Sequence, residues 1–172
     1  MLMKKVVEMA MINDENSHDE TLGDTIMKYA QNPPVQVEEL ANDLGIDIQL
    51  ENLGDDISGL IQRKSNNQYL IKVNSKHSER RQRFTIAHEV AHYVLHKDQI
   101  GDGIVDNAKY RANNMNDHDE TMANTLAVDI LMPANVLKQE YKKNRSIAPL
   151  ANKFDVSYDA MAYRLKNLGL NP

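Results

Sequence analysis

The chain contains no cysteine and no long apolar run. Without cysteine it cannot form a disulfide, a thiolate zinc site or a cysteine nucleophile, which fits a reducing compartment. No window approaches the roughly 18 consecutive apolar residues that a membrane-spanning helix needs. The N-terminal residues lack a small-residue cleavage site, and Glu8 interrupts their apolar run, so they do not resemble a secretion signal. We therefore expect a cytoplasmic protein that contacts no membrane.

Basic charge is scarce outside one segment. The net charge of -5 argues against a nucleic-acid-binding protein, whose domain would normally be strongly basic. Residues 1–133 contain 13 Lys and Arg against 22 Asp and Glu, whereas residues 134–172 contain seven against three. Only the C-terminal segment is basic. The length of 172 residues and the 41% hydrophobic content predict one globular domain with at most a small appended module.

The pattern of apolar and turn residues predicts an α+β protein. After an acidic helical lead-in (1–32), a short helix ends at Gly45, whose lack of a side chain suits a helix C-terminus. Three runs of strand-forming residues follow, and a turn separates the last two. These runs predict a small antiparallel sheet of about three strands, at 46–53, 57–64 and 68–74.

A long helix over 79–95, with Ser78 at its N-cap, is predicted to follow the sheet. The segment 97–117 is polar and without clear period, so it is predicted to be a long loop. Helical periodicity resumes over 119–132 and again in the C-terminal part of the chain. We divide the chain into a lead-in, a main domain (33–133) and a C-terminal helical subdomain (134–172) that packs on it, with helices at 134–141, 147–154 and 157–169.

The stretch FTIAHEVAHYVLH, residues 84–96, contains the pattern HExxH. His88 and His92 are four residues apart, so on a helix they lie on one face and can direct ring nitrogens at one ion. Glu89 lies about a quarter-turn away, where it can hold a water at that ion and take its proton. This is the arrangement of a zinc hydrolase, in which Zn²⁺ keeps one coordination position open. Alternatively, both histidines are ordinary residues of an amphipathic helix.

A third ligand distinguishes these alternatives. The metzincin pattern requires Gly at position 95 and His at position 98, but the chain has Leu95 and Asp98 there. The ligand should therefore be a carboxylate on a later helix, and Glu120 is the only glutamate between Glu89 and Glu140. Asn124, one turn after Glu120, is predicted to accept an N–H from His88 or His92 as an outer-shell residue.

Several other polar residues lie near the predicted ligands in sequence. His96 lies another turn along the helix, about 6 Å beyond His92, so we predict an outer-shell or core-edge role rather than ligation. The stabiliser of a developing oxyanion is not identified by the pattern, and Tyr93, Tyr110 and His118 are candidates. Three arginines begin the predicted helix, at positions 80, 81 and 83, and we expect them to form a solvated face.

The motifs RRQRFTIAHEVAHYVLH and ETMANTLAVDILMP resemble those of the ImmA/IrrE metallopeptidases, and the similarity covers roughly residues 33–170. The resemblance implies a zincin-like domain that binds Zn²⁺ through His88, His92 and Glu120, with Glu89 as the catalytic acid and base. It also implies a protein substrate, a helix-turn-helix repressor of a phage, a mobile element or a stress response, which is inactivated by cleavage. Val90-Ala91 and Leu126 depart from the Leu-Gly and Phe common in the family.

The C-terminal helices at 146–169 have the helix, turn and helix order of a DNA-binding motif. Lys153, Arg164 and Lys166 would supply charge for direct DNA contact. Because the net charge there is low, we favour packing of this pair on the main domain with a solvated basic face. Docking of a repressor is a third alternative. For the whole chain, the alternative to an enzyme is a zinc-containing antirepressor or toxin-antitoxin partner that sequesters a regulator without cutting it.

Overall fold

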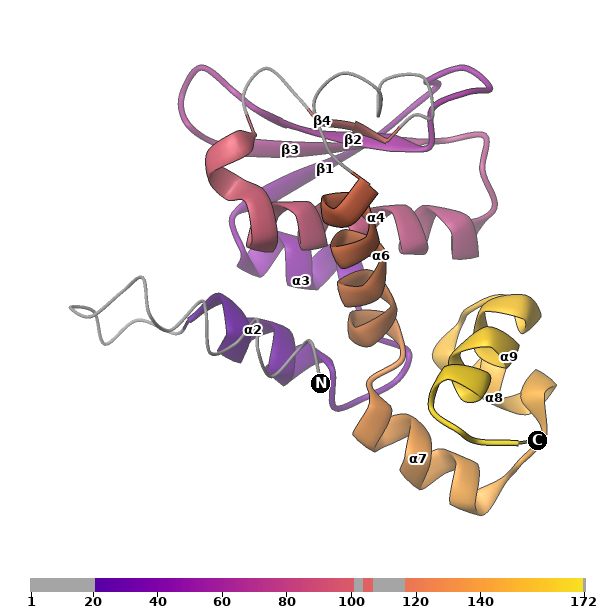
Figure 1. Ribbon diagram of the computed structural model, residues 1–172. Coiled ribbons are helices and arrows are strands. Elements are labelled where there is room, and N and C mark those ends of the chain that lie inside the picture. Colours follow the sequence, from indigo (N-terminus) through magenta and orange to yellow (C-terminus); the bar gives the residue numbers. More distant parts are fainter. Residues whose placement is uncertain (1–20, 101–103, 107–116, 172) are drawn as a thin grey trace.

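The computed structural model describes residues 21–100, 104–106 and 117–171. Most of the predicted lead-in, residues 1–20, lies outside this range. The described helices and strands confirm an α+β protein (Figure 1). The helices are α2 (Leu22–Tyr29), α3 (Val37–Asp43), α4 (Glu79–His96), α6 (Asp117–Leu131), α7 (Ala134–Lys143), α8 (Ile147–Phe154) and α9 (Tyr158–Asn167), and a short 3-10 helix, η1 (Lys97–Gln99), follows α4. The strands are β1 (Ile46–Glu51), β2 (Gly59–Arg63), β3 (Tyr69–Asn74) and β4 (Ile104–Asp106).

The described strands form one four-stranded sheet in the order β1-β3-β2-β4. The predicted hairpin is present, because β2 and β3 pair in antiparallel fashion. The prediction of a small sheet is confirmed, but its antiparallel pairing is wrong at β1, which joins the other edge of β3 in parallel, and a fourth strand is present. A strand's alternation of polar and apolar residues does not specify which edge it joins, so the sequence pattern could not distinguish these arrangements.

Strand β4 lies in the segment that was predicted to be a loop, and it pairs with β2 in antiparallel fashion. It has three residues, and glycines at positions 101 and 103 precede it. A strand this short has too few residues to show an alternating pattern. The prediction of a loop throughout 97–117 is therefore wrong at β4 and at η1.

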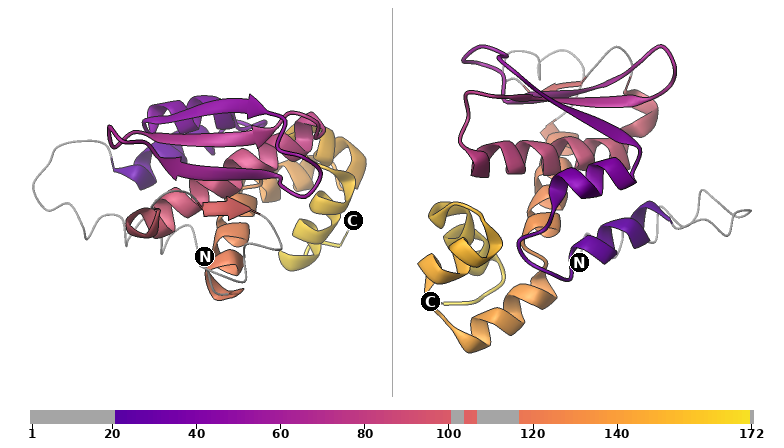
Figure 2. Two further views of the ribbon diagram at one scale, coloured as in Figure 1. Left: turned by 90° about the horizontal axis from the view of Figure 1, so that it is seen from above. Right: turned by 180° about the vertical axis from the view of Figure 1, so that it is seen from behind.

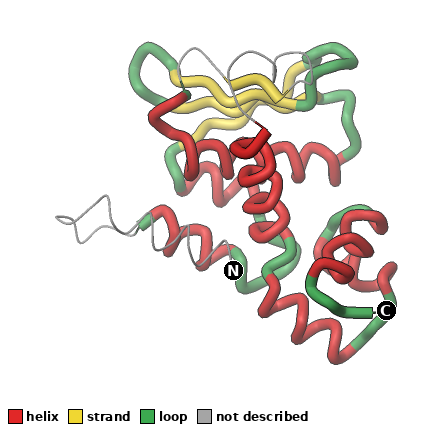
Figure 3. The backbone as a smooth tube through the Cα atoms, in the orientation of Figure 1, coloured by secondary structure: helices red, strands yellow, loops and turns green. Residues whose placement is uncertain are grey.

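Helices α3 and α4 cover one face of the sheet, and α6 crosses α4 at a steep angle (Figures 1 and 2). Ile61 and Ile71 pair across β2 and β3 and are completely buried, as is Val90 of α4. Each fully buried side chain of this kind contributes about 1.5–3 kcal/mol to folding. The strands and helices segregate into layers in Figure 3, so α4 has the sheet on one side and α6 on another.

The helix ends follow the sequence with one exception. Gly45 and Gly169 have positive φ angles of 75° and 69°, as their predicted places after helices α3 and α9 require. Ser157 caps α9, because its side chain accepts from the backbone N–H of Ala160. Ser78 occupies the N-cap of α4, but its side chain makes no capping hydrogen bond, so that predicted contact is wrong.

Helices α7, α8 and α9 lie where the periodicity predicted them. The basic residues expected to face solvent or DNA there are largely paired within the chain. Arg164 is 7% exposed and bonds to Asp129 and to the carbonyl oxygen of Met132, while Lys153 pairs with Glu140. Two of the three charges considered for DNA contact are therefore neutralised by the fold.

The arginines at the start of α4 form a solvated face only in part, because Arg81 is exposed while Arg80 and Arg83 are partly buried. Arg80 and Arg83 meet Asp155, and Arg81 donates to the hydroxyl oxygen of Ser58. Cations at a helix N-terminus oppose the helix dipole, and a facing carboxylate offsets that cost. In the part of the chain that the structure describes, no helix is both long and apolar enough to cross a membrane.

Candidate metal centre

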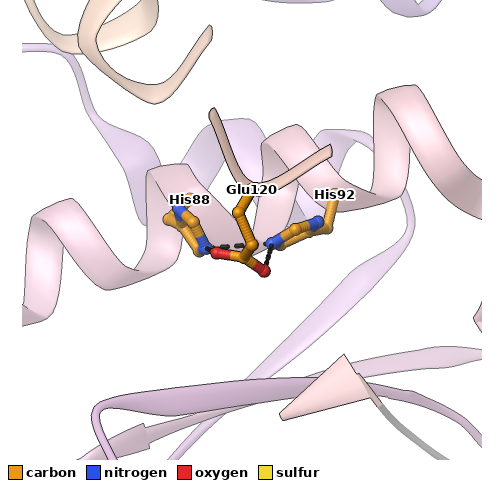
Figure 4. Close-up of side chains that lie close together, drawn as sticks. All are labelled: His88, His92 and Glu120. Carbon is orange, nitrogen blue, oxygen red and sulfur yellow. Dashed lines mark hydrogen bonds and ion pairs between the residues drawn. The ribbon is translucent and has the colours of Figure 1, made fainter. Parts of the chain in front are cut away.

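Three buried side chains converge between helices α4 and α6 (Figure 4). The Nε2 atoms of His88 and His92 are 2.9 Å apart. Glu120 approaches both rings, with Oε1 3.3 Å from Nε2 of His92 and Oε2 3.6 Å from Nε2 of His88. The exposed fractions of the three residues are 1%, 0% and 8%. The structure therefore brings together the three predicted ligands, from positions up to 32 residues apart in the sequence.

The spacing of these donor atoms suits a small tetrahedral cation. Bonds of about 2.0–2.1 Å to nitrogen and oxygen in tetrahedral geometry place neighbouring ligand atoms roughly 3.3 Å apart. The three observed separations, 2.9, 3.3 and 3.6 Å, lie on both sides of this value. A cation would also offset the cost of burying a carboxylate, which is high without a compensating charge. The residues present thus fit Zn²⁺, and three protein ligands would leave the fourth position of a tetrahedral ion for a water or substrate atom.

The local sequence explains this convergence. His88 and His92 are one turn apart on α4, so their rings lie side by side, with centroids 4.5 Å apart. Ala123 and Ala127 follow Glu120 by three and seven residues, which places them on the same face of α6. Both alanines are completely buried, and their small side chains allow α6 to approach α4 closely.

Glu89 follows His88 on α4 and approaches strand β2. It is 0% exposed, and its Oε1 lies 3.8 Å from the position that a Cβ atom would occupy on Gly59 of strand β2. A Cβ atom there would lie 2.3 Å from Cγ2 of Thr85 and 2.9 Å from the carbonyl oxygen of Lys72. Gly59 therefore lets β2 approach α4 beside the glutamate. Gly59 belongs to no motif of the sequence, although a glycine inside a strand is a known sign of close backbone approach.

His96 lies at the edge of this cluster. It is buried, its ring centroid is 5.8 Å from that of His92, and it is hydrogen-bonded to the backbone of Asp119, the residue before Glu120. Burial lowers the pKa of the His96 imidazole below 6.5, against the opposite effect of Asp119. Asn124 is half-buried, and the structure shows no hydrogen bond between it and His92. Outer-shell roles for His96 and Asn124 stay predictions.

The candidate oxyanion stabilisers lie in different surroundings. Tyr93 packs edge-on against Tyr69, with ring centroids 4.8 Å apart, and the ammonium group of Lys97 lies 4.9 Å from its ring centroid. His118 is exposed in the first turn of α6. Tyr110 is outside the described residues. Tyr93 thus already has polar and aromatic partners within the chain.

Residues 41–166 match the IrrE N-terminal-like domain, the peptidase M78 family. The chain belongs to this family. The match includes the helices that carry His88, Glu89, His92 and Glu120, and it confirms the resemblance inferred from the motifs. The family and the names of its relatives are those of metallopeptidases.

Relatives from two bacterial genera support this assignment. The chain is 33% identical over 102 residues to the radiation response metalloprotease IrrE of Deinococcus deserti, covering 56% of this chain and 36% of that protein. It is 30% identical over 133 residues to the metallopeptidase ImmA of Bacillus subtilis, covering 76% of this chain and 69% of ImmA. The chain spans about a third of the length of the two IrrE proteins that it matches, at 36% and 30%.

A solved structure has a similar fold. A Mycobacterium tuberculosis transcriptional regulator superimposes with a TM-score of 0.56 at 17% sequence identity, covering 96% of this chain and 52% of that one. At this identity the likeness concerns the fold alone.

Proposed function

We propose that this chain is a zinc-dependent endopeptidase that cleaves a helix-turn-helix transcriptional repressor and so relieves repression. The observation that supports the enzyme most directly is the convergence of His88, His92 and Glu120 beside a completely buried Glu89. A protein that only sequestered a regulator would need no carboxylate at this position. We assign His88, His92 and Glu120 as the ligands and Glu89 as the catalytic acid and base.

Zinc is the favoured metal because of the donor set. Two imidazole nitrogens and one carboxylate form a common catalytic zinc site, and the chain has no cysteine with which to build a closed thiolate site. When bound, Zn²⁺ would supply a Lewis acid at the substrate carbonyl and lower the pKa of the attacking water.

The residues of the chain supply the proton transfer. A Glu89 carboxylate oxygen accepts a proton from the water as the water oxygen bonds to the peptide carbonyl carbon. The same oxygen then donates that proton to the leaving nitrogen as the carbon–nitrogen bond breaks. One water is consumed, and the products are a carboxylate and an amine. His88 and His92 would hold the metal ion in a fixed place. Glu89 is buried, which limits its contact with bulk water.

The domain division and the substrate class are part of the same proposal. A zincin-like domain at 33–133 would carry the chemistry, and the C-terminal helical subdomain at 134–172 would pack on it. The substrate class rests on the resemblance to the ImmA/IrrE family. Internal pairing of Lys153 and Arg164 argues against direct DNA binding through 146–169 and favours a protein partner.

The test compares new protein N-termini in cells that produce the wild type or Glu89→Gln. Glutamine keeps the shape of the side chain but cannot accept the proton, so termini confined to the wild type are expected, at least one in a helix-turn-helix regulator. Equal zinc content in the two proteins is the control. Cleavage by Glu89→Gln at the wild-type rate would overturn the assignment. Equal relief of repression by both proteins, without new termini, would favour an antirepressor that works by binding.

A further inference from the structure

The C-terminal helices contact both helices that carry the proposed metal ligands. The first contact is made by Asp155, which ends α8 in a left-handed conformation with φ 50°. Its Oδ1 accepts from Nε of Arg80 at 3.1 Å, and its Oδ2 lies 3.1 Å from Nε of Arg83. Arg83 is well enclosed, with a side chain 11% exposed, and it also donates to the carbonyl oxygen of Val35. We call this set the Asp155 contact.

The second contact joins α9 to α6. The guanidinium of Arg164 bonds to Asp129 near the C-terminal end of α6 and, through Nε and Nη2, to the carbonyl oxygen of Met132 at 3.1 and 3.0 Å. Both ionic side chains are buried, at 9% and 10% exposure. We call this set the Arg164 contact. Helices α8 and α9, which pack on each other, therefore connect the start of α4 with the end of α6 (Figure 1).

The position of these contacts matters because α4 and α6 cross. Two crossed helices touch around one point and can pivot about it unless a second support holds them. Glu120 and Asp129 are nine residues apart, about 13.5 Å along the helix, so a tilt of about 1° about the Asp129 end moves Glu120 by about 0.2 Å. Metal sites hold ligand distances to within about 0.2 Å. The Arg164 contact, which fixes the C-terminal end of α6, can therefore determine whether Glu120 lies close enough to His88 and His92 to share a metal ion with them.

We propose that Asp155 and Arg164 are positioning residues, through which the C-terminal helices hold α4 and α6 at the angle that lets Glu120 meet His88 and His92. This inference rests on the proposed metal site and extends it to residues that lie outside that site. It gives a role to Arg80 and Arg83, two cations near the N-terminus of α4, where the helix dipole disfavours positive charge. It also assigns the C-terminal helices a role in assembling the site, in place of DNA contact.

Thermodynamic linkage gives the proposal a reciprocal consequence. If the Asp155 contact strengthens Zn²⁺ binding by some factor, bound Zn²⁺ must strengthen the Asp155 contact by the same factor. Added Zn²⁺ should therefore slow hydrogen exchange of backbone amides in α8 and α9, although neither helix contributes a ligand. Because bound Zn²⁺ also slows exchange throughout the fold by raising its global stability, the coupling is measured as slowing in α8 and α9 that exceeds the slowing of the β1 amides.

The deciding variant is Asp155→Asn, because asparagine tolerates the left-handed conformation and removes the charge. We expect the dissociation constant for Zn²⁺, measured by competition with a chelator, to rise roughly tenfold, at the lower end of the effect of outer-shell residues. The visible spectrum of the Co²⁺-substituted protein should change, since it reports the ligand geometry. Asp155→Gly also suits the positive φ and serves if the asparagine variant does not fold. Asp159→Asn, an exposed aspartate on α9, is the matched control and should match the wild type.

The outcomes separate the two proposals. Wild-type protein that bound no Zn²⁺ would remove the metal site and the positioning role together. The positioning role alone would be overturned if the wild type bound Zn²⁺, Asp155→Asn bound it equally well with the same Co²⁺ spectrum, and Zn²⁺ protected α8 and α9 no more than β1. Weaker binding and an altered spectrum in Asp155→Asn, but not in Asp159→Asn, would support it.

Discussion

Helix α6 carries a buried carboxylate near each end, and the two have different partners. Glu120 and Asp129 are similarly enclosed, at 8% and 7% exposure. Asp129 faces the guanidinium of Arg164, which supplies a full positive charge from within the chain. Glu120 faces the imidazole rings of His88 and His92. On the same helix, Asp129 is therefore paired with a cation of the protein, whereas Glu120 lies beside two side chains of a kind that commonly binds metal ions.

The difference separates a structural ion pair from a ligand site. A buried carboxylate is costly unless a cation or several hydrogen bonds compensate it. At Asp129 the fold provides that cation. At Glu120 the neighbours are lone-pair donors that converge with it, an arrangement that a bound cation stabilises. The burial of a carboxylate therefore does not by itself indicate a functional site. The chemical type of its neighbouring side chains indicates whether it is structural or a metal ligand.

The largest expected effect comes from Glu120→Ala. Loss of one of three protein ligands should weaken Zn²⁺ binding by more than the roughly 10–100-fold that outer-shell changes cost. Wild-type protein at a Zn²⁺ concentration of about 100 times the dissociation constant should gain about 2.7 kcal/mol in free energy of unfolding, and the variant should gain almost none. Calorimetry with and without Zn²⁺ measures this. Equal stabilisation of both proteins would exclude Glu120 as a ligand.

Zn²⁺ binding apart, the largest loss of stability in metal-free protein is expected from Asp129→Asn. Removing one partner of a buried ion pair leaves the other charge uncompensated, which typically costs about 3–5 kcal/mol. Part of the cost is avoided here, because Arg164 keeps its bonds to Met132. Denaturant unfolding measures the change, with exposed Asp159→Asn as the control. If Glu120→Ala destabilised the metal-free protein more than Asp129→Asn, then Asp129 would not be the structural carboxylate of α6 and Glu120 would not be only a ligand.

The smallest change in stability is expected from Glu140→Gln, which removes ion pairs that are more exposed than that of Asp129. Hydrogen bonds from Lys143 and Lys153 lower the pKa of its carboxyl group below 4.5. The folded state therefore favours the carboxylate, so this stabilisation is present above pH 4.5 and is lost as the pH falls through the lowered value. Glu140→Gln should melt slightly below the wild type at pH 7, and the two should converge in acid. A difference that grew on acidification would contradict this account.

Local rules predicted the parts of the molecule that depend on neighbours in sequence. Helical spacing placed His88 and His92 on one face, and the structure has their Nε2 atoms 2.9 Å apart. Gly45, Ser157 and Gly169 mark helix ends as their backbone preferences require. The same rules failed at Ser78, whose side chain makes no capping bond, and at β4, which is too short to carry a pattern.

The sequence by itself determined the helices, the β2–β3 hairpin, the HExxH geometry and the choice of Glu120 as the candidate third ligand. The tertiary structure alone decided that β1 runs parallel to β3, that Gly59 lies against α4, and that Arg80 meets Asp155, 75 residues away. The physical reason is that periodicity specifies which residues share a face of an element. Which other element covers that face depends on the packing of the whole chain.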